Sequence, residues 1–209
     1  MKLTKYQHAC FTLEKDGQLL VVDPGGYTHD LGAPENVVAI VVTHEHPDHF
    51  DASALGAIIA HNPDATIYGL ADIVNQLGDT LPNHAVTSGD IVNAGPFRLE
   101  FFGGEHADIP YMPHIHNLGV MIDDKLYYPG DSFDNPDRTV DTLALPAAAP
   151  WMKSAEAWEF LLAVKPRFVF PTHDAILSDA GKQLVDAMGP VVAEKAGATY
   201  QRLNEPVEI

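Results

Sequence analysis

The sequence predicts a layered α/β fold, and three observations support this prediction. Strand-like and helix-like segments alternate near both ends of the 209-residue chain. Successive strand-like segments occupy its middle, from Ala85 onward, and short apolar runs repeatedly end in polar loops. Such alternation is typical of β-sheets covered by helices on their outer faces. The length suits one sizeable core, so we expect a single domain spanning residues 1–209.

The N-terminal half is expected to open with a β-hairpin and to continue as alternating strands and helices. Lys15-Asp16-Gly17 joins the first two strand-like segments, and Asp-Gly is a strong hairpin signal. Residues 37–42 are β-branched and continuously apolar, which is typical of a buried strand. Gly78 ends a helix-like segment, as glycine commonly does. The expected elements, in order, are strands at residues 9–14, 18–23 and 37–42, a helix at 52–60, a strand at 66–68 and a helix at 71–77.

The second half is expected to form an antiparallel meander and then to return to alternation. Asp123-Asp124 joins two strand-like segments of this meander. Glu156 lies in the first turn of a predicted helix, where negative charge is favourable. Asp174 is interpreted as the N-cap of the last helix. The expected elements are strands at residues 97–102, 118–122, 125–128 and 139–145, a helix at 154–164, a strand at 167–170 and a helix at 175–188.

Composition and charge restrict the partners. The formal net charge is -17, and nucleic-acid affinity depends on Lys and Arg neutralising phosphates, so nucleic acid is an unsuitable partner. The sequence shows no signal peptide and no apolar run long enough to span a bilayer, so we expect a cytoplasmic protein without a membrane partner. The single cysteine, Cys10, is expected in the core. We expect a small-molecule substrate, and the sequence leaves room for a homo-oligomer.

The segment Thr43–Phe50 is the most informative part of the chain. It places three imidazoles and a carboxylate directly after the apolar residues 37–42, namely His44, His46, Asp48 and His49. Imidazole and carboxylate hold Zn²⁺, Mn²⁺ and Fe²⁺, whereas structural zinc sites commonly recruit cysteine. Ligands and catalytic groups gather at the carboxyl ends of strands in α/β sheets. The segment therefore predicts a metal site at a sheet edge.

Three later strand-like segments also run into potential metal ligands. Residues 97–102 lead to His106, residues 125–128 lead to Asp131, and residues 167–170 lead to His173. If these strands end at one edge, their side chains complete the site begun by the Thr43–Phe50 segment.

The spacing His44-x-His46-x-Asp48-His49, followed by His106, Asp131 and His173, resembles the metallo-β-lactamase superfamily over nearly the whole chain. The segments Gln7–Phe11, Asp23-Pro24 and Tyr128–Ser132 are similar to the branch that contains ascorbate-phosphate lactonase and many uncharacterised metal-dependent hydrolases. The resemblance implies a four-layer αββα sandwich of two mixed β-sheets flanked by helices.

The resemblance also implies a dinuclear metal centre. His44, His46 and His106 would hold one ion, Asp48, His49 and His173 would hold the other, and Asp131 would bridge them. We expect two divalent ions, with Zn²⁺ preferred and Mn²⁺ or Fe²⁺ as alternatives. Two such ions lower the pKa of a shared water, so a metal-bound hydroxide serves as the nucleophile.

Several side chains keep two interpretations at the sequence level. His106, His114 and His116 lie close together, and we prefer His106 as the ligand because it comes soonest after the strand and matches the family pattern best. The candidate catalytic residues are then Asp48, His114 and His116, the two histidines as substrate contacts or proton donors, with surface-loop histidines as the alternative interpretation.

Three further residues are also open to two interpretations. Asp23 either accepts a hydrogen bond from a ligand imidazole or simply ends a turn before Pro24. His8 lies either near the site or on an edge strand. Trp151 either walls a pocket or packs into the core.

We therefore predict a dinuclear metal-dependent hydrolase that acts on a small-molecule ester, lactone or phosphodiester. One alternative is an iron-dependent redox enzyme on the same fold, but diiron relatives replace the second histidine of the first motif with Glu, and this chain has His46 there. The other alternative is a metal-binding protein without hydrolytic activity.

Overall fold

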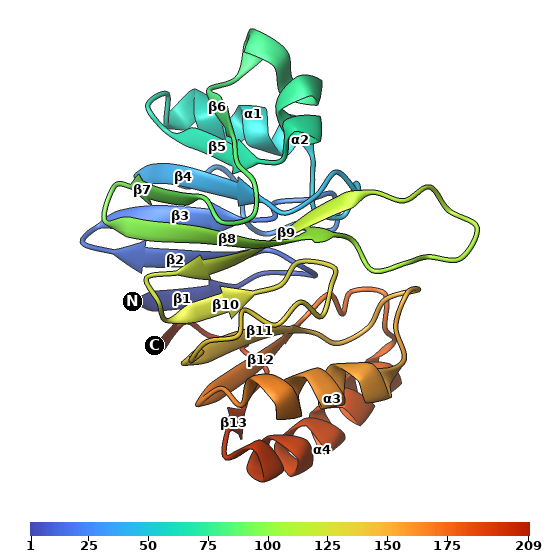
Figure 1. The fold of residues 1–209 in the computed structure, drawn as a ribbon. Helices are drawn as coiled ribbons and strands as arrows, with labels where there is room; N and C mark the ends of the chain where they lie inside the picture. The colour runs from blue at the N-terminus through green and yellow to red at the C-terminus, as the bar shows by residue number, and fades with distance from the viewer.

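Two seven-stranded mixed β-sheets face each other between helices in the computed structural model, which describes all 209 residues (Figure 1). The predicted four-layer αββα fold is therefore confirmed. In the first sheet the strand order is β14-β1-β2-β3-β4-β5-β6, and in the second it is β13-β12-β11-β10-β9-β8-β7. Each sheet combines an antiparallel part with a run of parallel strands.

The strands of the first sheet come mainly from the N-terminal third of the chain. They are β1 (Lys2–Lys5), β2 (Phe11–Lys15), β3 (Gln18–Val22), β4 (Val37–Val42), β5 (Thr66–Gly69), β6 (Asn83–Ala85) and β14 (Val207–Glu208). The predicted turn between β2 and β3 is present, with positive φ at Asp16 and Gly17. These angles match the right-handed twist of a tight hairpin.

The second sheet holds the meander and the later parallel strands. They are β7 (Ile91–Ala94), β8 (Phe97–Glu105), β9 (His116–Ile122), β10 (Leu126–Tyr128), β11 (Thr142–Pro146), β12 (Phe168–Thr172) and β13 (Thr199–Tyr200). A long loop between β8 and β9 projects from one side of the molecule (Figure 1).

Helices cover the outer face of each sheet. They are α1 (Ala52–His61), α2 (Ala71–Leu77), α3 (Ser154–Val164) and α4 (Asp179–Ala196), with a short 3₁₀ helix at Gly78–Thr80. Ile58 of α1 shares a buried cluster with Val42 of β4. Leu161 of α3 shares another with Val169 of β12. No helix is long and apolar enough to cross a membrane.

The main core lies between the sheets. Phe11 of β2 meets Tyr128 of β10 and Phe170 of β12 edge-on, with ring centroids 5.5 and 6.0 Å apart. All three side chains are fully buried. The predicted burial of Cys10 is confirmed, and burial raises the pKa of its thiol to about 12. This core holds the two sheets together and so aligns their edges.

The interpretation of Asp174 as a helix cap is wrong. The last helix begins at Asp179, and Ser178 caps it by accepting a hydrogen bond from the backbone N–H of Gly181. Asp174 instead pairs with Arg202. The helix also runs to Ala196, past Pro190, because the chain meets its left-handed glycine cap only at Gly197.

Candidate metal centre

The predicted ligands lie on loops that follow β4, β8, β10 and β12, and the fold brings these loops to one edge. One backbone hydrogen bond joins the loop after β4 to β9 of the other sheet, and a second joins the loops after β8 and β10. The N–H of Leu118 donates to the carbonyl oxygen of Thr43 at 3.0 Å, and the N–H of Ala107 donates to that of Asp131 at 2.9 Å. The carboxyl ends of the strands thus form one site, as the sequence predicted.

The seven predicted ligands come together in two groups. His44, His46, His106 and Asp131 form the first group, and His8, Asp48, His49 and His173 form the second. Within each group, the candidate ligand atoms all lie within 4.8 Å of one another. This division matches the predicted one, with His8 as an addition to the second group.

Four buried ligand atoms in these groups have no hydrogen-bond partner. They are Nε2 of His49, His106 and His173 and Oδ1 of Asp131. Nε2 of His49 lies only 3.2 Å from this oxygen, yet the two atoms do not form a hydrogen bond. Leaving buried polar atoms unpaired is costly, and a metal ion satisfies such atoms. The residues therefore fit a pair of metal ions.

Asp131 lies between the two groups. Its Oδ1 is close to His49 of the second group, and its Oδ2 lies 3.5 Å from Nε2 of His106 and 3.1 Å from Nε2 of His173. A carboxylate so placed can bind both ions, as the predicted bridging role requires.

The second nitrogen of three ligand rings is held by a protein oxygen. Nδ1 of His49 donates to Oδ2 of Asp23 at 2.7 Å. Nδ1 of His106 donates to the carbonyl oxygen of Ala107 at 2.5 Å, and Nδ1 of His173 donates to that of Ala148 at 2.6 Å. Because these oxygens only accept, the proton sits on Nδ1 and the Nε2 lone pair is free for a metal.

Asp23 accepts hydrogen bonds from both Thr43 and His49. Its Oδ1 accepts a hydrogen bond from the backbone N–H of Thr43 at 2.8 Å, and its Oδ2 accepts one from the Thr43 hydroxyl at 2.7 Å. Together with the bond from His49, these contacts show that Asp23 orients a ligand ring. Of its two sequence interpretations, the structure supports this one.

His8 has the opposite hydrogen-bonding arrangement. The backbone N–H of Ala175 donates to Nδ1 of His8 at 3.3 Å. The ring proton therefore sits on Nε2, which donates to Oδ2 of Asp48 at 2.8 Å. His8 is fully buried, and burial lowers the pKa of its ring. The neutral ring thus positions Asp48 and offers no free lone pair to a metal.

The carboxylates dominate the electrostatics of the site. Burial alone would raise the pKa of Asp131, but His49 and His173 outweigh it and hold this pKa well below the ordinary value. Burial also opposes ionisation of Asp48, yet the nearby imidazole of His173 and the hydrogen bond from His8 lower its pKa. Burial lowers the pKa of His173, but Asp131 and Asp48 raise it to about 9. The site therefore favours positive charge, which divalent cations supply.

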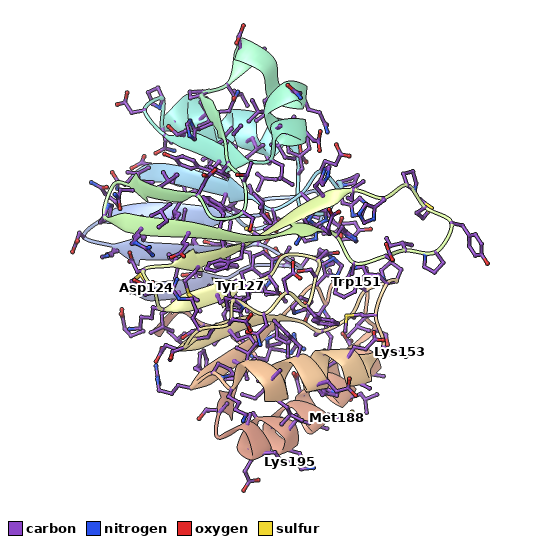
Figure 2. The ribbon with its side chains drawn as sticks, viewed as in Figure 1. Asp124, Tyr127, Trp151, Lys153, Met188 and Lys195 are labelled. Carbon is purple, nitrogen blue, oxygen red and sulfur yellow. The ribbon has the colours of Figure 1, made fainter.

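Trp151 makes a contact that sequence reasoning missed. Its Nε1 donates to Oδ2 of Asp131 at 2.9 Å, and its ring meets that of Phe133 with centroids 5.1 Å apart. Figure 2 shows Trp151 on the side of the ligand loops, opposite the edge that carries Asp124. An indole beside a proline- and alanine-rich loop was the available signal, but nothing in it indicated Asp131.

His114 and His116 lie outside both groups, and their side chains are 55% and 58% exposed. His114 contacts Glu105 and, at 3.3 Å, Asp108. Nδ1 of His116 lies 3.3 Å from Asp72. His114 lines a cavity of about 20 Å³ together with His46 and His106, so of the two it is nearer to the ligands.

Two facing mixed sheets between helices, with two histidine and carboxylate groups at the strand ends, define a protein of the metallo-β-lactamase fold with a candidate two-metal centre. Residues 2–173 match the family model described as "Beta-lactamase superfamily domain". The chain belongs to this superfamily and, within it, to the UPF0173 family.

Similar proteins occur in bacteria and archaea. Protein Rv0786c of Mycobacterium tuberculosis is 38% identical over 85% of this chain and 86% of its own length. UPF0173 protein PYRAB01190 of Pyrococcus abyssi is 30% identical over 83% of each. A UPF0173 metal-dependent hydrolase of Carboxydothermus hydrogenoformans is 26% identical over 87% of this chain and 90% of its own.

Solved structures share the fold at lower identity. Igni18, a metallo hydrolase from Ignicoccus hospitalis, has a TM-score of 0.72 and 20% identity, over 100% of this chain and 98% of that one. YhfI from Bacillus subtilis has a TM-score of 0.68 and 18% identity, over 99% of this chain and 98% of that one. CmlA, a diiron β-hydroxylase from Streptomyces venezuelae, has a TM-score of 0.65 and 17% identity, over 99% of this chain and 53% of that one.

Proposed function

We propose that this protein is a dinuclear metal-dependent hydrolase that cleaves a small-molecule ester or lactone, with phosphodiesters as the alternative substrate class. The unpaired ligand atoms of His49, His106, Asp131 and His173 carry this proposal. They are buried, and they belong to the two groups that can hold ions. The metal-dependent hydrolases among the curated relatives support the same reaction class.

Two bound divalent ions would lower the pKa of a shared water and stabilise the negative charge that develops on the substrate oxygen. The protein side chains keep that centre in position. Asp23 and the carbonyl oxygens of Ala107 and Ala148 orient three imidazoles, while His8 and Trp151 orient the two carboxylates. Zinc is the ion we propose, because an open site of nitrogen and oxygen ligands binds it more tightly than manganese or iron.

The ligand types favour hydrolysis over redox chemistry. His46 joins His44, His106 and Asp131 in the first group, so that group offers three imidazoles and one carboxylate. Because the diiron enzyme CmlA shares this fold, iron-dependent redox chemistry is the main alternative function. A metal-binding protein without activity would show the same ligands but no turnover.

The test combines ligand variants with a substrate screen. His46→Ala and Asp131→Ala should each lower kcat/KM by at least about a thousandfold, because each removes a metal ligand. Zinc- and manganese-loaded protein is assayed with p-nitrophenyl butyrate, a γ-lactone and bis(p-nitrophenyl) phosphate. Circular dichroism checks that the variants remain folded.

His61→Ala is the matched control. His61 is exposed on α1, and its ring contacts only the carbonyl oxygen of Ala57 in the same helix. It should keep wild-type turnover. Full turnover by the His46 or Asp131 variant would overturn the proposal.

A further inference from the structure

We infer that the substrate presents an uncharged carbonyl group and acyl part to this centre, without a phosphate or carboxylate. This inference rests on the proposed hydrolase function and narrows its substrate class. It follows from the charges on the loops around the ligands, from the aromatic side chains beside them and from the placement of the nearest cations.

The loops that border the centre are almost free of cationic side chains. They comprise residues 23–30, 43–51, 103–117, 129–141, 146–153 and 172–178, which contain two cationic residues, Arg138 and Lys153. Arg138 pairs with Glu100 and Asp124. Lys153 is the other. Its side chain is 85% exposed, and its Nζ lies 3.9 Å from Glu156 of α3. Figure 2 shows Lys153 at the outer end of α3. The Lys153 ammonium group therefore lies at a solvent-exposed helix end, beside a carboxylate.

Carboxylates occupy the exposed rim instead. The acidic rim consists of Asp72 on α2 and of Glu105 and Asp108 beside the β8–β9 loop, with side chains 50%, 64% and 91% exposed. Asp108 lines the small cavity that also contains His46 and His106. An anionic substrate would meet this negative charge while approaching the first group of ligands.

Lys5, Lys182 and Arg202 line one pocket, and protein groups hold two of these three cations. Lys5 donates from Nζ to the carbonyl oxygens of Tyr6 and His8, both at 2.6 Å. The ring of His8 is bonded to Asp48, so Lys5 contacts the backbone of this residue and not the ligands. Arg202 is paired with Asp174 and Asp186. Lys5 therefore supports the backbone next to the ligands, and two carboxylates balance the charge of Arg202.

Aromatic side chains flank the ligands where an acyl group could bind. Trp151 is half-buried, and its ring centroid lies 6.2 Å from that of His106. On the side of the second group, Tyr27 is 46% exposed and lies edge-on to His8 at 5.0 Å. Such surfaces bind apolar substrate parts.

Phosphate and carboxylate recognition normally uses Arg or Lys side chains that form charge-assisted hydrogen bonds. Here the loops offer an anionic substituent only two such side chains, the exposed Lys153 and the paired Arg138. The imidazoles of His114 and His116 already pair with the acidic rim. The acidic rim would repel an anionic substituent. A neutral ester or lactone needs only the metals and the aromatic walls. The substrate class is therefore a neutral, partly apolar carbonyl compound.

The test uses two esters that differ by one charge. p-Nitrophenyl butyrate and mono-p-nitrophenyl succinate have the same leaving group and the same four-carbon acyl chain, but the succinate ends in a carboxylate. Zinc-loaded wild-type protein at low salt should show a kcat/KM at least about tenfold higher for the butyrate. A preference for the succinate would overturn the inference.

A charge reversal then tests the acidic rim directly. Asp108→Lys should raise the ratio of succinate to butyrate kcat/KM by about fivefold at low salt, and 0.5 M salt should remove most of the gain through screening. Asp64→Lys is the matched control, because Asp64 is exposed just before β5, at the opposite end of the strands. Its ratio should remain that of the wild type.

A binding measurement separates recognition from turnover. Calorimetric titration of the zinc-loaded protein with inorganic phosphate should show about fivefold tighter binding to Asp108→Lys than to the wild type or Asp64→Lys. Equal phosphate affinity in all three proteins would overturn the inference. If no probe of any class is hydrolysed, the proposed function itself fails, whereas preference for the anionic ester contradicts only this narrower inference.

Discussion

Neighbouring groups assign the ring proton of four imidazoles in this centre. Oxygens of Asp23, Ala107 and Ala148 hold Nδ1–H of three ligand rings, whereas Ala175 donates a hydrogen bond to Nδ1 of His8. The ligand rings therefore direct a lone pair inward, and His8 directs a proton at Asp48. This contrast separates ligands from supporting residues in a way that spacing in the sequence does not.

His8 provides the first test at this scale. His8→Ala should weaken binding of the second ion by about 10- to 100-fold, because Asp48 loses the donor that orients it. His8→Gln should stay within about threefold of the wild type, since its amide can still donate to Asp48. Competition with a chromophoric chelator measures both affinities.

A role of His8 as a metal ligand would give different metal affinities for these variants. If His8 bound the ion directly, the glutamine variant would lose the second ion as the alanine variant does. In that case the nitrogen NMR signals of the zinc-loaded protein would also show Nε2 of His8 without a proton.

Trp151 provides the second test. Trp151→Phe keeps an aromatic ring beside Phe133 but removes the hydrogen bond to Asp131, so zinc affinity and kcat/KM should fall about tenfold. Chelator competition and ester hydrolysis measure the two effects. Phe133→Leu serves as the control for packing, because it leaves the indole donor in place. An unchanged zinc affinity in Trp151→Phe would show that this bond does not support the centre.

At the scale of elements, the loop after β3 packs directly against the loop after β4. A Cβ atom on Gly25 would lie 2.1 Å from the carbonyl carbon of Asp48 and 2.4 Å from the backbone nitrogen of His49. The N–H of Gly26 donates to the carbonyl oxygen of Pro47 at 2.7 Å. The first loop therefore positions the backbone of two ligands.

Gly25→Ala should lower the free energy of unfolding by about 3 kcal/mol or more, because both loops must move apart. It should also reduce the bound metal. Gly56→Ala is the control, since its new Cβ meets nothing within 4 Å inside α1, and it should stabilise by about 0.5–1 kcal/mol. Urea unfolding measures both variants, and a Gly25→Ala protein as stable as the wild type would contradict this packing.

The sequence predicted elements well where one strong local signal dominated. The bounds of β4 were predicted correctly from its β-branched, apolar residues. Those of α2 were predicted correctly from the glycine that follows it. Strand β1, Lys2–Lys5, was missed because its polar residues gain their partners only from β2 and β14. Pairing between strands is a tertiary effect that a local pattern does not contain.

The metal centre shows the same difference between features that a local sequence signal predicts and contacts that form only in the folded chain. Candidate ligands such as His44 and His49 were predicted because their residue types and spacing suit a metal, and the fold brings them together. The carbonyl of Ala148 and the indole of Trp151 were not found, because a carbonyl has no sequence signature and the Trp151 contact joins loops from different strands. Such contacts depend on how the second sheet folds against the first.

For the whole molecule, the fold gathers negative charge at one sheet edge. The chain carries a net charge of -17, and three carboxylates, the buried Asp23 and Asp131 and the partly exposed Asp48, lie within or beside the ligand groups. Unpaired ligand atoms there would destabilise a metal-free protein. Two divalent cations would offset both costs, and their binding would then be coupled energetically to the fold.

The metal content of the protein tests this account most directly. Protein purified without chelators and exchanged into metal-free buffer should contain about two equivalents of divalent transition metal per chain by elemental analysis. Asp131→Ala should contain about one equivalent or less, because both ions lose a shared ligand. Less than one equivalent of any transition metal in the wild-type protein would contradict the dinuclear centre.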